Sequence, residues 1–241
     1  MRILVASSNP GKLREYQAMA ATHAAVAPPA TAESIEFQLL ANLESLPPFE
    51  ESAPTFAENA AGKALHYSRF ADDAVIADDS GLVVPALGGA PGVHSARYAG
   101  PQASDADRVN KLLADLSMAG AFGVLKGGHA GPPLPSKAAT VGADPRLPRA
   151  QSRGACPPPV ARFVCVLALA RQGRALAVFS DCVEGVLLDA PRGAGGFGYD
   201  PIFLDPPLGK TFAELSREEK NLLSHRGKAF RKLLAHVREK I

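Results

Sequence analysis

Two adjacent carboxylates directly follow a short apolar run, and their types and position make them candidates for chemistry. The run 74–77 leads into Asp78, Asp79, Ser80 and Gly81, so we expect a buried strand that ends at a small acidic turn. Two acids there cost several kcal/mol, roughly, through desolvation and repulsion unless a cation, N–H donors or a raised pKa compensates. A hard divalent cation such as Mg²⁺ is the simplest compensation. An ordinary acidic turn between strands is the alternative.

The segment that follows the first apolar run could hold a phosphate. It consists of Ser7, Ser8, Asn9, Pro10, Gly11 and Lys12. If a helix begins there, free backbone amides, hydroxyls and one ammonium meet where an anion is stabilised. The Walker A spacing is absent, so a plain strand-to-helix turn with a solvated lysine is the alternative.

A glycine-rich segment in the last fifth of the chain could lie against a flat ligand. Four glycines in the range 193–198 let a backbone approach a ligand closely. Phe197 and Tyr199 supply flat surfaces, and Asp200 supplies an acceptor for a base edge or a ribose hydroxyl. A glycine-rich hairpin loop with aromatic side chains in the core is the alternative.

Two charged clusters could serve the same site. Lys220 stands at the end of one predicted helix, and His225 and Arg226 stand at the start of the next, where an anion is also favoured. Glu50 and Glu51 precede the helix that leads to the two acids. Solvated surface charges are the alternative in each case. Jointly, the phosphate loop, the acids, the aromatic segment and the cations are the parts needed to hold and hydrolyse a nucleoside triphosphate.

The elements that must position these residues alternate between strands and helices. We expect a helix from Phe56 to Phe70, because Thr55 and Glu58 have capping-box spacing, and another capping box begins at Ser216. Strands are expected at 2–6, 74–77, 162–170, 175–179 and 182–188, helices at 12–21, 56–70, 104–116 and twice near the C-terminus, and one weak helix or strand within 24–48. Hairpin-linked strands beside helix-linked ones predict an α/β fold around a mixed sheet.

Composition favours a globular cytoplasmic protein. No stretch approaches the ~20 apolar residues of a membrane span, and the apolar start is too short for a secretory signal. The chain has 26 basic and 24 acidic residues, but five of the basic ones and only one acid fall within 119–159. The remainder is therefore net negative, which argues against a nucleic-acid binder. We expect Cys156, Cys165 and Cys182 to be free thiols, buried rather than ligands of a metal.

The range 119–159 is expected to be a disordered insertion. It contains eight prolines and seven glycines, and it shows neither helical nor strand periodicity. A solvated loop without a dedicated role is the preferred interpretation, and a basic arm for an acidic partner is the alternative.

Six motifs in order make the chain resemble the inosine/xanthosine triphosphate pyrophosphatase family, which hydrolyses non-standard purine nucleotides. They are residues 7–12, 55–60, 78–82, 89–97, 195–201 and 224–226. The resemblance implies a single α/β domain over 1–241, with an elongated mixed sheet, two lobes and a central active-site cleft. It also implies a homodimer that uses Mg²⁺ and converts ITP, dITP, XTP or dXTP to the monophosphate and pyrophosphate.

The resemblance also implies residue roles. Asp79 would be the base, Lys12 would share the catalysis, and Glu51 with Asp79 would hold Mg²⁺, with Asp78 as an alternative further ligand. Arg97 would support the cleft. Substrate contacts would come from Ser7, Ser8, Asn9, Pro10, Gly11, Lys12, Ser80, Phe197, Gly198, Tyr199, Asp200, Lys220, His225 and Arg226.

The chain departs from the family pattern in two places, and three other functions are alternatives to the one the resemblance implies. The 119–159 insertion and the 24–48 stretch are both longer than the family's usual connections. A Maf-type pyrophosphatase would act on other nucleotides, and the set 197–200 with 224–226 argues against it. A non-catalytic nucleotide sensor is disfavoured by Asp78, Asp79 and Lys12, and an RNA-binding module by the net negative core.

Overall fold

A computed structural model describes residues 1–7, 10–26, 35–122 and 157–239, and its centre is one seven-stranded sheet. The strand order is β2-β1-β3-β4-β5-β6-β7. Strand β1 pairs in parallel with β2 and β3, and every later pair is antiparallel. The strands are β1 (Arg2–Val5), β2 (Glu36–Leu39), β3 (Ala74–Val83), β4 (Val160–Arg171), β5 (Arg174–Leu187), β6 (Phe203–Asp205) and β7 (Lys210–Thr211). The predicted α/β fold with a mixed sheet is confirmed.

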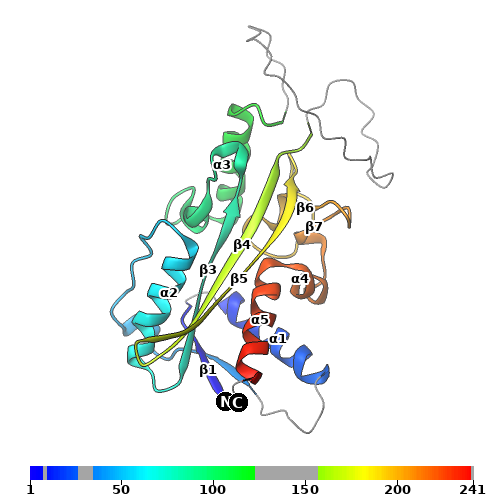
Figure 1. The fold of residues 1–241 in the computed structure, drawn as a ribbon. Coiled ribbons are helices and arrows are strands. Elements are labelled where there is room, and N and C mark those ends of the chain that lie inside the picture. The colour runs from blue at the N-terminus through cyan, green and yellow to red at the C-terminus, as the bar shows by residue number, and fades with distance from the viewer. Residues whose placement is uncertain (8–9, 27–34, 123–156, 240–241) are drawn as a thin grey trace, which may run out of the picture.

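The helices cover both faces of the sheet, as Figure 1 shows. Helix α2 packs on one face of β3 and β4, whereas α1 and α5 lie on the other, and α3 lies at the end of the molecule away from the termini. The helices are α1 (Pro10–Val26), α2 (Phe56–Tyr67), α3 (Asp105–Met118), α4 (Arg217–Leu223) and α5 (His225–Glu239).

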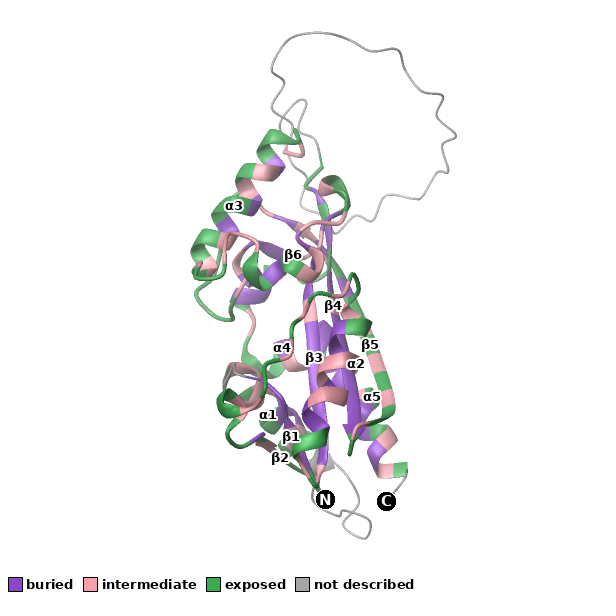
Figure 2. Cartoon of the chain, turned by 90° about the vertical axis from the view of Figure 1, so that its left-hand side faces the viewer, coloured by how far each residue is buried: buried purple, intermediate pink, exposed green. Residues whose placement is uncertain are grey.

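Three hydrophobic clusters pack the helices against the sheet. One joins β1, β3 and β4 to α1 and α5, with Tyr16, Phe37 and Phe230 in mutual ring contact. The second joins the opposite face to α2, and the third packs α3 with the far ends of β3, β4 and β5. Figure 2 shows the buried residues concentrated along these strands. The long strands β3 and β4 therefore contribute residues to all three clusters.

Local sequence explains where the helices begin. The Thr55 hydroxyl accepts from the Glu58 amide at 3.2 Å, as expected, although the Glu58 carboxylate contacts that hydroxyl rather than reaching back to the backbone. Helix α2 ends at Tyr67 and gives way to a 3₁₀ turn over Ser68–Phe70, so the predicted helix was one turn too long. The capping box at Ser216 is complete.

Two strand boundaries were predicted wrongly. Asp78, Asp79, Ser80 and Gly81 are not a turn, because β3 continues through them to Val83. Strand β4 supplies an unbroken antiparallel partner over that range, and nearby cations and amides compensate for the acids. The predicted strands 175–179 and 182–188 are one strand, β5, because ladder pairing to β4 continues between them.

Other sequence predictions fall outside the described residues or need correction. Cys165 is buried and free, but Cys182 is free and exposed, because its side chain lies on the uncovered face of β5. Cys156 and residues 123–156 of the predicted insertion lie outside the described residues. Across the described ranges, no helix combines the length and apolar character that a membrane span requires.

Gly81 is required by close packing inside β3, so we expect Gly81→Ala to destabilise the protein. A Cβ at this position would clash with the Ser95 side chain and lie 2.5 Å from the Gly92 carbonyl oxygen. The Leu82 amide donates to the same Ser95 hydroxyl at 2.9 Å, so the clash also disturbs this hydrogen bond. Urea denaturation should show a loss of about 1–3 kcal/mol.

Gly88→Ala is the matched control for Gly81→Ala. A Cβ there meets no atom within 4 Å, although Gly88 has a positive φ of 63°. Its effect should therefore be limited to backbone strain of about 1–2 kcal/mol. Full wild-type stability in Gly81→Ala would show that the segment around Ser95 yields to the added methyl group.

Candidate functional site

Strand β3 presents its two acids to opposite faces of the sheet. Successive side chains alternate along a strand, so Ile76, Asp78 and Ser80 face α1 and α5, whereas Ala77 and Asp79 face α2. Strand β1 pairs with β3 only as far as Ile76. Beyond that point, as far as the bridge between Val83 and Pro91, no strand among the described residues pairs with this edge of β3. A ligand at the end of β1 can therefore reach side chains from both faces.

Asp78 is a buried carboxylate surrounded by cations. Lys12 Nζ donates to one of its oxygens at 2.8 Å, and Arg226 Nε lies 3.5 Å from the other. The Ser80 hydroxyl also donates to Asp78, at 3.2 Å. Burial alone would raise the pKa of Asp78, but the charges of Lys12 and Arg226 hold it well below its usual range. Asp78 is therefore an ionised structural partner of Lys12.

Asp79 lies in a different environment on the α2 side. Asn59 Nδ2 donates to Asp79 Oδ2 at 3.0 Å, and Glu51 is close enough to act on it electrostatically. Burial raises the pKa of Asp79 to about 6; the hydrogen bond from Asn59 opposes this shift, and the negative charge of Glu51 adds to it. A carboxylate poised near neutral pH suits a general base.

Glu51 and Asp79 form a two-carboxylate set that fits a hard cation. Both side chains offer anionic oxygen ligands, and the burial and neighbouring charge that raise the pKa of Asp79 show that a nearby cation would stabilise its ionised form. Lys63 Nζ, 2.5 Å from Glu51, supplies part of that positive charge. Among the residues that the structure describes, no three His, Cys, Asp or Glu side chains gather as a metal site. Two carboxylates suffice where substrate phosphates and waters complete the coordination.

The glycine-aromatic segment is held by a carboxylate-centred network. Asp200 is buried, and it accepts from the Phe197 amide at 2.8 Å and from Lys220 Nζ at 2.6 Å. The Lys220 ammonium also lies 4.4 Å from the centre of the Phe197 ring. Gly196 has φ of 71°, and a Cβ there would clash with Asp200. The glycine is thus needed both for its backbone angle and for this close approach.

The neighbouring residues anchor this segment to the start of α3 and to Ser95. The Gly198 amide donates to an Asp105 carboxylate oxygen at 2.7 Å, and the Tyr199 hydroxyl donates to the Ser95 carbonyl at 3.0 Å. Tyr199 is buried and packs in the core cluster around α3. Of the two aromatics, Phe197 is therefore the one available to a ligand, being 36% exposed.

His225 and Arg226 lie buried at the start of α5. The His225 ring stacks on Phe163 at 4.8 Å between centres, and its Nδ1 has no hydrogen-bond partner within the described ranges. Burial, together with the charges of Arg226 and Lys220, lowers the pKa of His225 well below its usual value, so the ring is neutral. The Arg226 guanidinium donates to Glu15 at 2.8 Å and to the Ser80 hydroxyl at 3.0 Å.

One cavity of about 450 Å³ joins most of these groups. Its lining includes Gly11, Lys12, Ser80, Gly81, Phe197, Gly198, Tyr199, Asp200, Lys220, His225 and Arg226. Asp79 and Glu51 do not line it, because they lie on the α2 side of β3. The structure therefore brings the first loop, β3 and the glycine-aromatic segment together, whereas the two metal candidates contact α2.

The N-terminal loop is only partly described. Ser7 is buried just after β1, and Gly11 and Lys12 lie in the first turn of α1. Ser8 and Asn9 fall outside the described residues, and so does the side chain of Pro10. Their predicted phosphate contacts stay predictions.

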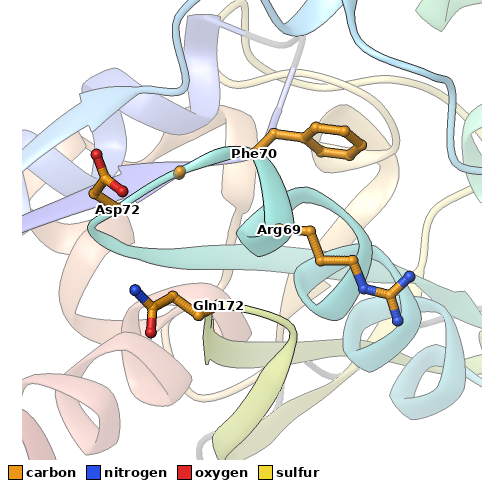
Figure 3. Close-up of a pocket in the computed structure, with 5 residues that line it drawn as sticks. Arg69, Phe70, Asp72 and Gln172 are labelled. Atoms are coloured by element: carbon orange, nitrogen blue, oxygen red, sulfur yellow. The ribbon is translucent and has the colours of Figure 1, made fainter.

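A second cavity lies at the end of the sheet where β4 turns into β5. It measures about 520 Å³ and is lined by Arg69, Phe70, Ala71, Asp72 and Gln172. Figure 3 shows Arg69 and Phe70 extending to one side while Asp72 and Gln172 lie on the other. These side chains do not converge, so the larger cavity is not the better candidate site.

Sequence reasoning missed three residues that the structure places in this network. Glu15 contacts both Arg226 and, at 3.7 Å, Lys220. Asn59 and Lys63 reach the two carboxylates from α2. Helical spacing offered a signal, because Glu15 lies three residues after Lys12 and Lys63 lies four after Asn59, which places each pair on one helix face.

Fold and site together define an α/β protein with an open mixed sheet and a polar cavity of nucleotide size at the end of a parallel strand. The sequence profile of the Ham1 family matches residues 3–123 and 151–236. The chain therefore belongs to the Ham1 family, and the resemblance seen in its motifs is confirmed.

Similar proteins agree with this placement. The dITP/XTP pyrophosphatase of Geobacillus kaustophilus is 42% identical over 96% of this chain and 91% of its own length. The dITP/XTP pyrophosphatase of Methylococcus capsulatus is 40% identical over 98% of this chain and 96% of its own length. The HAM1 protein of Coxiella burnetii superposes with a TM-score of 0.71 at 35% identity, covering 99% of both chains. The Staphylococcus aureus Ham1 protein superposes with a TM-score of 0.70 at 32% identity, and the match covers 100% of both chains.

Proposed function

We propose that this chain is a nucleoside triphosphate pyrophosphatase that hydrolyses ITP, dITP, XTP and dXTP to the monophosphate and pyrophosphate, and so removes them from the nucleotide pool. The observation that carries the proposal is the single cavity in which the first-loop ammonium, strand β3 and the glycine-aromatic segment meet. Relatives that are 37–44% identical bear the name dITP/XTP pyrophosphatase, which supports the same reaction.

The phosphate end of the site lies where β1 gives way to α1. Lys12 and the first-turn amides of α1 supply positive charge there, and Lys63 adds a second ammonium from the α2 side. A triphosphate across the free edge of β3 would thus lie between cations from both faces of the sheet. Donors fixed in advance around the phosphates stabilise the charge that moves to the leaving pyrophosphate.

We assign the metal to Glu51 and Asp79 and propose that it is Mg²⁺. When bound, Mg²⁺ would neutralise phosphate charge and lower the pKa of water. Asp79 would accept the proton from the attacking water, which the same cation would have acidified. Asn59 donates to Oδ2 of Asp79, which leaves Oδ1 available for this role.

The base end of the site would recognise a 6-oxo purine. Phe197 supplies a flat surface, and Lys220, Arg226 and neutral His225 supply polar groups at the cavity wall. A 6-amino purine would place a donor against donors, a mismatch of ~1–3 kcal/mol. GTP shares the 6-oxo group, so its exclusion depends on its 2-amino group.

We expect pyrophosphate release from dITP or XTP to be about 5- to 150-fold faster, as kcat/KM, than release from ATP, which is the range that a mismatch of ~1–3 kcal/mol produces. The measurement is a pyrophosphate assay across a panel of ITP, dITP, XTP, ATP, GTP, dTTP and UTP. Equal rates on all purines would remove the proposal.

The same panel separates the rival functions. A Maf-type pyrophosphatase would prefer dTTP or UTP, and a non-catalytic nucleotide sensor would bind nucleotides without releasing pyrophosphate. EDTA should abolish the activity and added Mg²⁺ should restore it, whereas activity that persists in EDTA would remove the metal assignment. A homodimer, a cytoplasmic location, a single domain and the absence of a nucleic-acid partner stay predictions.

A further inference from the structure

We propose that Asn59 is a positioning residue that locks the loop carrying Glu51 to Asp79, so that the two carboxylates of the metal site keep a fixed spacing. The inference rests on the proposed function. Asn59 would touch neither metal nor substrate, and it would act only through the groups it holds.

The first support is the set of hydrogen bonds that the side-chain amide of Asn59 makes. The residue is fully buried on α2. Its Oδ1 accepts from the Ala53 amide at 3.0 Å, and its Nδ2 donates to the Ala53 carbonyl at 3.3 Å. The same Nδ2 donates to Asp79 at 3.0 Å. One carboxamide therefore pairs with both backbone groups of a loop residue, as a neighbouring strand would, and with a carboxylate of β3.

The second support is that the loop needs such a tether. Residues 49–53 belong to no helix or strand, and a hydrogen bond from the Ser52 amide to the Glu50 carbonyl at 3.0 Å tightens the turn. Glu51 lies two residues before Ala53. Two other side chains in the described part of the chain hold Glu51: Lys63 Nζ lies 2.5 Å from its carboxylate, and Arg97 donates to its carbonyl at 2.8 Å. Both come from long, flexible side chains.

The third support is geometry on α2. Asn59 and Lys63 are four residues apart and share a helix face, and Figure 1 shows α2 alongside β3. Asn59 reaches Asp79 while Lys63 reaches Glu51. A single rigid helix thus sets the positions of both carboxylates. Groups that orient metal ligands in this way typically change metal affinity or activity by about 10- to 100-fold when they are removed.

The test compares wild type, Asn59→Ala and Thr55→Ala. Thr55 caps the same helix without contacting either carboxylate, so Thr55→Ala reproduces the destabilisation of α2 alone. Mn²⁺ binding is followed by electron paramagnetic resonance with α,β-methylene-dITP present. We expect Asn59→Ala to weaken Mn²⁺ binding about 10- to 100-fold and Thr55→Ala to leave it unchanged. Equal Mn²⁺ affinity in the two variants overturns the proposal.

A second measurement uses the wild-type protein, so that the proposal can be tested even if Asn59→Ala does not fold. In ¹⁵N-asparagine-labelled protein, the Asn59 side-chain signals should shift when Mg²⁺ is added to the complex with the analogue, because Nδ2 donates to Asp79. Unmoved signals overturn the inference. The proposed function fails separately, if wild type releases no pyrophosphate from dITP.

Discussion

Replacing Asp79 by asparagine is expected to lower the kcat for dITP by about 10²- to 10⁴-fold, the contribution of a positioned general base. The loss should appear without unfolding. An asparagine oxygen can still accept from Asn59, and the substitution removes a buried charge beside Glu51 that the fold disfavours. We therefore expect a melting temperature at pH 8 equal to or above that of wild type, combined with pyrophosphate release near background.

Two matched substitutions define what this result means. Asp73→Asn makes the same change near the start of β3, where Asp73 forms a partly exposed ion pair with Arg2, and it should leave activity unchanged. Asp78→Asn makes the change one residue away and should lower stability, because neighbouring cations favour the charge of Asp78. An Asp79→Asn enzyme that retains wild-type kcat would exclude Asp79 as the base.

The contrast between these neighbouring acids shows what the sequence could not provide. The motif predicted two carboxylates at a reaction centre, and the structure bonds Asp78 to the cavity residues Lys12 and Ser80 but turns Asp79 toward α2. Sequence alone could not assign them to opposite faces, because the run 74–77 looks like a complete strand. That strand continues only because β4, which follows about 80 residues later in the chain, pairs with it residue by residue. Long-range pairing of this kind leaves no local signal.

Most of the helical framework was predictable because its signals are local. The caps at Thr55 and Ser216 and the apolar face of α5 lie within a few residues of the elements they define. The tethers of the site could not be predicted in the same way. Glu15 meets Arg226 across 211 positions, and Gly198 meets Asp105 across 93. A glutamate in a predicted helix looks like an ordinary surface charge until the partner helix is in place.

Lys12→Met is expected to reduce kcat/KM for dITP by about 10²- to 10³-fold, the usual effect of removing one donor that stabilises developing charge. It should also destabilise the fold. Lys12 lies 2.8 Å from Asp78, whose side chain is 1% exposed, and breaking a buried pair from one side costs about 3–5 kcal/mol. Arg226, 3.5 Å away, remains to offset part of that loss. Urea denaturation and the pyrophosphate assay measure the two effects separately.

The double variant Lys12→Met, Asp78→Asn distinguishes the two roles of Lys12. Removing both charges leaves no uncompensated carboxylate, so stability should return most of the way to wild type. Asparagine at position 78 can still accept from Ser80, and Arg226 keeps its contact with Glu15. If Lys12 binds the phosphates, activity stays low although the fold is restored. If activity returns together with stability, Lys12 serves only as the counter-ion of Asp78, and the phosphates must be held by other groups of the first loop.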